Sequence, residues 1–258
     1  MSQDTPYNCS NIKVSQTLEG SDISIDVIEY DNLTASSPGE AMSFYYMNRA
    51  NIKLRQCVVK LKGKSGIQLS PGAMSFIHGR IDMTSNVKGV GDFFGKVMKA
   101  AVTKEQAIKP LYKGVGEIFL EPSYRHYILL DLNNESVCVD DGMFFAASEN
   151  VKVTARPISS ISAATLGGEG LFNLCLEGTG PVILECKVPE SEIVFYELVN
   201  DILRVDGNFA VLWSSSLKFT VQKSGKSLLG SAVSGEGLVN VYEGSGRVWL
   251  APTLRFHS

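Results

Sequence analysis

The segment Gly244-Ser245-Gly246-Arg247-Val248-Trp249-Leu250 indicates a repeated architecture, because the chain contains two further copies of it. The copies are Gly178-Thr179-Gly180-Pro181-Val182-Ile183-Leu184 and Gly114-Val115-Gly116-Glu117-Ile118-Phe119-Leu120. They lie 64 and then 66 positions apart, and a period held this closely indicates repeated supersecondary units. Glycine adopts positive φ at no steric cost, and each glycine pair precedes a β-branched or aromatic run. We therefore expect each copy to be a hairpin turn that leads into a strand.

Two other elements recur with this spacing. An acidic turn begins nine or ten residues before each glycine pair, and its glutamates are Glu105, Glu169 and Glu236. A second glycine turn occurs as Asp140-Asp141-Gly142 and as Asp206-Gly207, with Pro71-Gly72 as a looser relative. Asp-Gly between apolar runs is typical of a hairpin, because both residues tolerate the positive φ of primed turns.

The order of these elements predicts how the chain is divided. The N-terminal segment has only the second glycine turn, whereas residues 232–252 have only the other two elements. We expect a single domain over residues 1–258 with three units: residues 11–85 completed by residues 232–252, then residues 100–156 and 165–222. This closure would remove an open sheet edge, and it predicts that Val239 to Leu250 pairs with strands from residues 10–80.

Apolar periodicity predicts an all-β fold with one short helical insertion. Residues 23–30 alternate apolar and polar side chains, residues 52–61 form another strand candidate, and Pro38-Gly39 precedes an apolar strand start. Only residues 92–102 show the 3.6-residue period of a helix. We expect this helix to pack on the body, with contact to a membrane or a partner as the alternative.

Composition narrows the class of protein. The 258 residues are 44% hydrophobic and 20% charged, which is typical of a globular chain, and the net charge of −3 argues against a broad nucleic-acid or membrane surface. No apolar run approaches the roughly 20 residues that span a bilayer. Five cysteines without a C-x-x-C pair or a signal peptide predict reduced, buried thiols and a cytoplasmic location.

No motif for nucleotide binding, catalysis or metal binding has the residue spacing that it requires. Gly89-Val90-Gly91 lacks the third glycine of a dinucleotide fingerprint, and Ser224-Gly225-Lys226-Ser227 has Thr220 where a P-loop requires glycine. The histidines are scattered, at His78, His126 and His257. Cys175 and Cys186 could face each other on adjacent strands, but a second pair of zinc ligands is missing. We expect no catalytic, cofactor-binding or metal residues, and no cofactor.

The repeated glutamates support one sharper hypothesis. If the units are related by a pseudo-threefold axis, Glu105, Glu169 and Glu236 occupy equivalent positions and their carboxylates could converge on a cation. The alternative, which we favour, is that each glutamate caps a turn or faces solvent.

Residues 167–172, 203–207 and above all 226–237 resemble the family named for altered inheritance of mitochondria protein twenty-four, and the likeness runs from about residue 23 to 252. This resemblance implies a fold related to the tryptophan RNA-binding attenuation protein (TRAP), built of repeated β-units. Most bacterial members have no established activity, and the fungal member is associated with the mitochondrial inner membrane. This chain lacks a transit-like N-terminus, so a mitochondrial role is not expected. It also lacks the basic motif of the attenuation protein, which puts tryptophan and RNA binding in doubt.

These observations favour a non-enzymatic structural or interaction protein that forms homo-oligomers. The alternative is a small-ligand or nucleic-acid binding module on a TRAP-like fold. A pocket with convergent polar groups would favour a ligand, a basic groove would favour RNA, and a large apolar surface would favour assembly.

Overall fold

The computed structural model describes residues 7, 9–84, 109–140, 142–157, 172–207, 209–223 and 238–254. Its N-terminal elements are β1 (Ile12–Leu18), β2 (Ile23–Tyr30), α1 (Pro38–Arg49), β3 (Leu54–Lys62), β4 (Ile67–Leu69), β5 (Met74–Thr84) and β6 (Leu111–Leu120). The middle elements are β7 (His126–Val139), β8 (Phe144–Ser148), β9 (Val151–Pro157) and β10 (Phe172–Cys186). After a 3₁₀ turn at Glu190–Glu192 come β11 (Val194–Asp206), β12 (Ala210–Ser214), β13 (Lys218–Lys223) and β14 (Leu238–Leu250).

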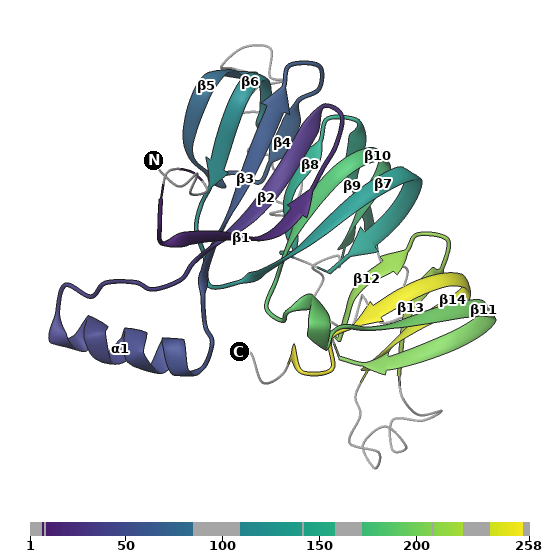
Figure 1. The fold of residues 1–258 in the computed structure, drawn as a ribbon. Helices are drawn as coiled ribbons and strands as arrows, with labels where there is room; N and C mark the ends of the chain where they lie inside the picture. The colour runs from purple at the N-terminus through teal and green to yellow at the C-terminus, as the bar shows by residue number, and fades with distance from the viewer. Residues whose placement is uncertain are drawn as a thin grey trace, which may run out of the picture.

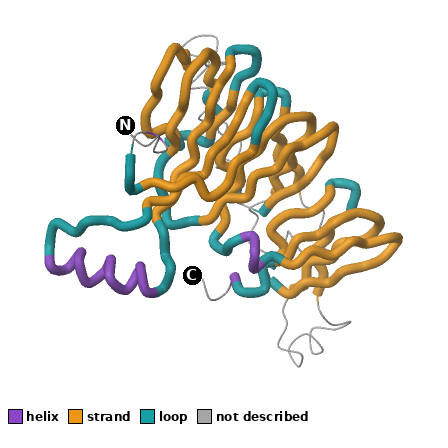
Figure 2. Tube along the Cα trace, viewed as in Figure 1, coloured by secondary structure: helices purple, strands orange, loops and turns teal. Residues whose placement is uncertain are grey.

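All 14 described strands belong to one antiparallel sheet, which confirms the expected all-β class (Figures 1 and 2). Figure 1 shows three groups of strands side by side: β3–β6, β7–β10 and β11–β14. In each group the last strand is long and carries the Gly-x-Gly sequence. β6 pairs with β3, β4 and β5, whereas β10 pairs with β7, β8 and β9. β14 pairs in the same way with β11, β12 and β13.

Different strands join the three groups. β4 pairs with β8 between the first two groups, and β12 pairs with β7 between the last two. The two junctions are therefore not equivalent, and the described strands do not show the pseudo-threefold relation expected from the sequence.

The expected closure of the chain is wrong. β14 pairs with strands of its own group and lies far along the sheet order from β1 to β5. β14 thus does not complete the unit that begins near residue 11. β14 has its partner strands within its own group, because β11 and β12 precede it in the chain.

Residues 38–49 form a helix where the sequence analysis expected a strand. Ser37 is extended, with φ −143°, and its hydroxyl accepts a hydrogen bond from the Glu40 N–H, while the Glu40 carboxylate accepts from Ser36. Pro38 occupies the first turn, where its missing N–H costs nothing. Ser-Pro-Gly-Glu is thus a capping signal here and not a turn between strands. The helix expected at residues 92–102 lies outside the described residues.

Three main hydrophobic clusters run along the sheet. The first includes Ile25 on β2 and Ile118 on β6, and the last includes Trp213 and Tyr242 in the C-terminal group. The middle cluster joins residues of β7 and β10 to Val211, Leu212 and Ala251 of the C-terminal group. Neighbouring groups therefore share a core.

The expectation of reduced thiols is wrong for two cysteines. Cys138 on β7 and Cys175 on β10 form a disulfide, because antiparallel pairing sets them directly opposite each other, with 4.1 Å between their Cα atoms. Cys186 lies on the same strand as Cys175, so those two do not face each other on adjacent strands. Cys9, Cys57 and Cys186 are free thiols.

Candidate interaction surfaces

The Gly-x-Gly pairs lie inside the long strands and are not hairpin turns, which corrects the expectation from the sequence. Both glycines of each pair have positive φ, for example +140° at Gly178 and +128° at Gly180. A Cβ atom on Gly178 would lie 2.2 Å from the backbone oxygen of Asn150, and one on Gly116 would lie 2.3 Å from that of His78. Only glycine lets the neighbouring strand approach so closely.

A bulge on the partner strand faces two of these glycine pairs. Asn134 on β7 has φ 53°, and its N–H donates to Thr179 Oγ1 at 3.0 Å. Asn200 on β11 has φ 51°, and its N–H donates to Ser245 Oγ at 2.9 Å. The hydroxyl group of the residue between the two glycines thus accepts a hydrogen bond from the backbone N–H of the bulged asparagine. These asparagines were not predicted from the sequence, although their 66-residue spacing was a signal for them.

A groove of about 490 Å³ lies between β7 and the C-terminal group. Apolar side chains of Leu130, Leu132, Val137, Leu212 and Trp249 contribute to its wall. Its charged residues are Asp131, Glu135, Glu197 and Arg247, so carboxylates outnumber the single guanidinium.

The charged side chains of this groove favour a neutral or positively charged ligand. Its excess of carboxylates would repel phosphate groups, so the groove does not fit a nucleic-acid backbone. The Ser136 hydroxyl oxygen is buried and, among the described residues, has no hydrogen-bond partner. No group of three or more candidate metal ligands occurs in the part of the chain that the structure describes.

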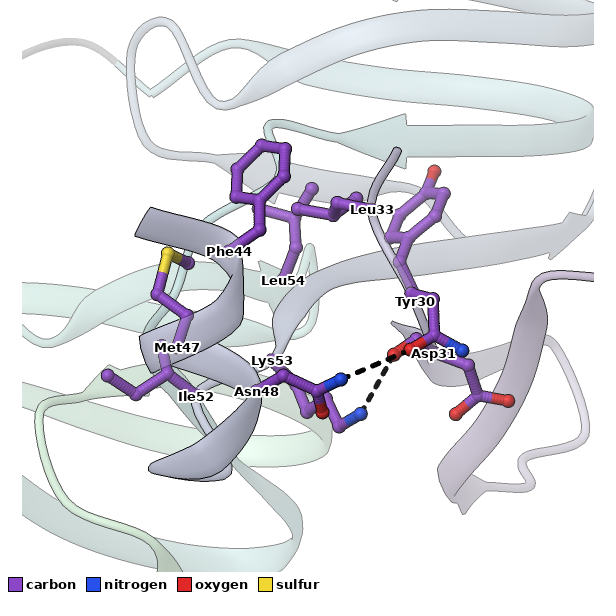
Figure 3. Close-up of a pocket in the computed structure, with 10 residues that line it drawn as sticks. Tyr30, Asp31, Leu33, Phe44, Met47, Asn48, Ile52, Lys53 and Leu54 are labelled. Atoms are coloured by element: carbon purple, nitrogen blue, oxygen red, sulfur yellow. Dashed lines mark hydrogen bonds between the residues drawn. The ribbon is translucent and has the colours of Figure 1, made fainter. Parts of the chain in front are cut away.

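Helix α1 lies within the β2–β3 connection and projects away from the sheet (Figure 1). Its Phe44 and Met47 side chains face the parts of this connection before and after the helix (Figure 3). Lys53 Nζ donates to the Asp31 carbonyl oxygen at 2.8 Å, which closes the base of the connection. The hollow beneath the helix has a volume of about 50 Å³, enough for a water molecule or two but not for a larger ligand.

The outer face of α1 carries a stripe of large side chains. Met42, Tyr45 and Tyr46 are more than half exposed, and no residue of the helix is buried. The Arg49 guanidinium carbon lies 5.5 Å from the centroid of the Tyr45 ring. Because a 12-residue helix is marginal alone in water, so exposed a helix is suited to contact with another molecule.

Strand β11 is the second place where apolar side chains gather on the surface. It stands at one end of the strand order and pairs with β14. Its exposed apolar residues are Val194, Phe195, Tyr196, Val199 and Ile202. The Phe195 ring lies 6.4 Å from that of Trp249, so this surface adjoins the groove.

A charged network near the N-terminus supports the sheet. Burial would raise the pKa of Asp26, but hydrogen bonds from Lys60, Tyr7 and Thr17 outweigh it and lower the pKa. The pKa of Glu29 is likewise lowered, because hydrogen bonding and charge from Arg55 outweigh burial. These groups tie β1, β2 and β3 together, which is a structural role.

The residues singled out from the sequence do not form a site in the described part of the chain. His78 is exposed on β5, with Nδ1 3.4 Å from Glu117 Oε2, and His126 begins β7 opposite Cys186. Burial raises the pKa of the Cys186 thiol, which disfavours the thiolate needed for zinc or nucleophilic chemistry. His257, Glu105, Glu169, Glu236 and both rejected nucleotide motifs, at residues 89–91 and 224–227, lie outside the described residues.

Comparison with known proteins gives a family and a fold. The sequence model of the family described as mitochondrial biogenesis AIM24 matches residues 48–253. A crystal structure of a Streptococcus pyogenes protein matches with a TM-score of 0.58 at 20% identity, covering 76% of this chain and 88% of that one. At this identity the likeness shows the fold alone. None of the curated proteins compared with the chain matches it.

Proposed function

We propose that this chain, which belongs to the AIM24 family, is a structural or interaction protein without enzymatic activity that forms homo-oligomers. The observation that carries this proposal is the distribution of exposed apolar side chains. Nine of them lie on β11 or in and beside α1: Val194, Phe195, Tyr196, Val199 and Ile202, with Met42, Tyr45, Tyr46 and Ile52. Gathered apolar surface of this kind is typical of protein contacts, whereas scattered single residues are not.

The proposal includes three pseudo-repeated units on a TRAP-like fold. Its support is the threefold recurrence of one pairing pattern, in which a long Gly-x-Gly strand pairs with the three strands before it. The two equivalent bulges at Asn134 and Asn200 add to it. Proteins built from repeats extend through contacts between neighbouring units, and this favours assembly over catalysis.

A small-ligand binding module is the second candidate. The groove between β7 and the C-terminal group favours it, because the buried Ser136 hydroxyl and the Trp249 ring lie beside carboxylates. A nucleic-acid ligand has less support, since the acidic residues of the groove repel phosphate.

No helix in the described part of the chain has the length and apolar character needed to cross a membrane. The cytoplasmic location expected from the sequence stays a prediction. The Cys138–Cys175 disulfide weighs against it, because disulfides are rare in a reducing cytosol.

Native mass spectrometry of protein purified without refolding tests the proposed function. We expect an assembly of two or more 28.0 kDa chains that carries no added small-molecule mass. A single chain at micromolar concentration would contradict the homo-oligomer. A stoichiometric extra mass on each chain would favour the ligand-binding candidate.

A further inference from the structure

Strands β7 and β11 occupy matching places, 66 positions apart, in the middle and C-terminal groups. Each pairs along one edge with the long Gly-x-Gly strand of its group, β7 with β10 and β11 with β14. Each also contains a positive-φ asparagine, Asn134 or Asn200, bonded to the hydroxyl between the glycines. The residues that contact β7 therefore indicate which kind of surface β11 contacts.

The C-terminal group covers β7. On its second edge, β12 pairs with β7 and places Leu212 opposite Val139 and Ser214 opposite Val137. Ile128 is 6% exposed and Leu130 is partly buried, and both belong to the cluster that includes Val211 and Leu212. An apolar face on β7 is thus matched by apolar residues of the next group.

Strand β11 has exposed apolar residues on both of its faces and, among the described residues, no following group to cover them. Val194 corresponds to Ile128 and is 45% exposed. At the bulge, Val199 occupies the position that the polar Asn133 has on β7, and it is 78% exposed. Ile202 occupies the position of Ser136 and is 42% exposed. The last unit of an array normally has a polar outer face, so an apolar end indicates a further contact.

A second copy of this chain is the partner that the pairing favours. The short strands that join the groups already have two partners each: β4 pairs with β6 and β8, β8 with β10 and β4, and β12 with β14 and β7. Another copy therefore offers no free strand of the β12 type among its described residues. Its own β11 has the same uncovered edge, and two identical edges meet around a twofold axis.

The charges and faces of β11 fit this arrangement. Leu198 before the bulge and Leu203 and Val205 after it contact the core, whereas Glu197 and Arg204 are exposed. Antiparallel pairing centred on the bulge sets Glu197 opposite Arg204 of the second copy, and Leu198 opposite Leu203. Directly opposite residues share a face, so this register keeps core-facing residues together and forms two opposite-charge pairs. It also places Val199 against Ile202.

We propose that β11 is a self-association surface, through which two copies pair antiparallel with Glu197 of each beside Arg204 of the other. This inference rests on the proposed homo-oligomer and names its interface. The apolar residues of β11 supply buried area, and the charge pairs select the register.

Sedimentation velocity of the full chain with single and paired charge reversals tests the interface. Glu197→Arg and Arg204→Glu should each weaken the dimer at least about tenfold, because each places like charges opposite each other twice. The double variant Glu197→Arg with Arg204→Glu should restore the dimer. Glu121→Arg, an exposed change just after β6, is the matched control and should leave the dimer unchanged.

Far-UV circular dichroism checks that every variant keeps its strand content. A dimeric wild type whose dissociation constant is unchanged by both single reversals would overturn the β11 interface and leave the homo-oligomer standing. Failure of the double variant to restore the dimer would overturn the antiparallel register. A monomeric wild type would remove the homo-oligomer itself, and the interface with it.

Discussion

The first glycines of the three Gly-x-Gly pairs differ in how closely other atoms approach them, although the three sequences are alike. A Cβ atom on Gly178 would collide with the Asn150 carbonyl oxygen at 2.2 Å, whereas one on Gly244 would have its nearest neighbour, Leu217 Cδ2, at 3.9 Å. Both glycines have positive φ, +140° and +122°. At both positions any residue other than glycine would have a strained backbone, but only at Gly178 does another backbone segment approach closely.

The variants Gly178→Ala and Gly244→Ala separate these two effects. Gly244→Ala should cost about 1–2 kcal/mol in the free energy of unfolding, from backbone strain alone. Gly178→Ala should cost about 3 kcal/mol or more, since the collision adds displacement of the β9 backbone. Urea denaturation of both variants measures the difference, and equal losses would show that close approach has no energetic role.

Asp26 gives the sheet an acid-sensitive contact. Because its pKa is lowered in the folded state, its stabilising effect is complete above the ordinary aspartate pKa of about 3.9. That effect is lost as the pH falls below this value and through the lower pKa of the folded state. The Lys60 ammonium is partly exposed, so the contribution is about 1 kcal/mol.

Replacing Asp26 by Asn should remove this part of the pH dependence. Near neutral pH the Asp26→Asn variant should unfold more easily than wild type by about 1 kcal/mol, and this gap should shrink as the pH falls below about 3.9, the ordinary aspartate pKa, and through the lower pKa of folded Asp26. Asp82→Asn, on the exposed part of β5, is the control. The idea fails if the stability gap between wild type and Asp26→Asn stays constant from pH 7 to pH 2.

At the scale of elements, the disulfide joins β7 to β10 beneath the junction with the C-terminal group. Cys138 pairs in register with both Cys175 and Trp213, so it lies between β10 and β12. Its sequence separation of 37 from Cys175 closes a long loop, which restricts the unfolded chain.

Thiol counting in denaturant tests the disulfide. Without reductant the unfolded protein should react at three thiols, those of Cys9, Cys57 and Cys186, and after reduction at all five cysteines. Reduction should also lower the free energy of unfolding by about 2–4 kcal/mol. Five reactive thiols before reduction would show that the bond is absent.

The elements also show where sequence patterns mislead. The alternating pattern of residues 23–30 correctly predicts β2, although the structure buries both faces of this strand, the polar Ser24 and Asp26 included. Pro38-Gly39 looks like a turn, but Ser37 and Glu40 satisfy a helix N-terminus around it. A glycine pair before an apolar run reads the same in a hairpin and in the middle of a long strand, because the difference lies in the strand beside it.

Across the whole molecule, three groups of strands follow one another along a single sheet. The spacing of 64 and 66 residues predicts where the long strands lie, but not which edges meet. Edge pairing depends on contacts between groups, and for this reason the expected closure of the chain was wrong. The surfaces on α1 and β11 were equally hidden from the sequence, since an apolar strand residue has the same local pattern whether it is covered or exposed.

In the proposed dimer, a second copy of the chain covers β11, the counterpart of the covered strand β7. Hydrogen–deuterium exchange of β11 amides at high and low protein concentration tests it most directly. Exchange of the β11 amides should be slow in the dimer, comparable to that of the β7 amides, and faster on dilution, while exchange in β7 stays unchanged. Exchange in β11 that is fast and the same at both concentrations would contradict it.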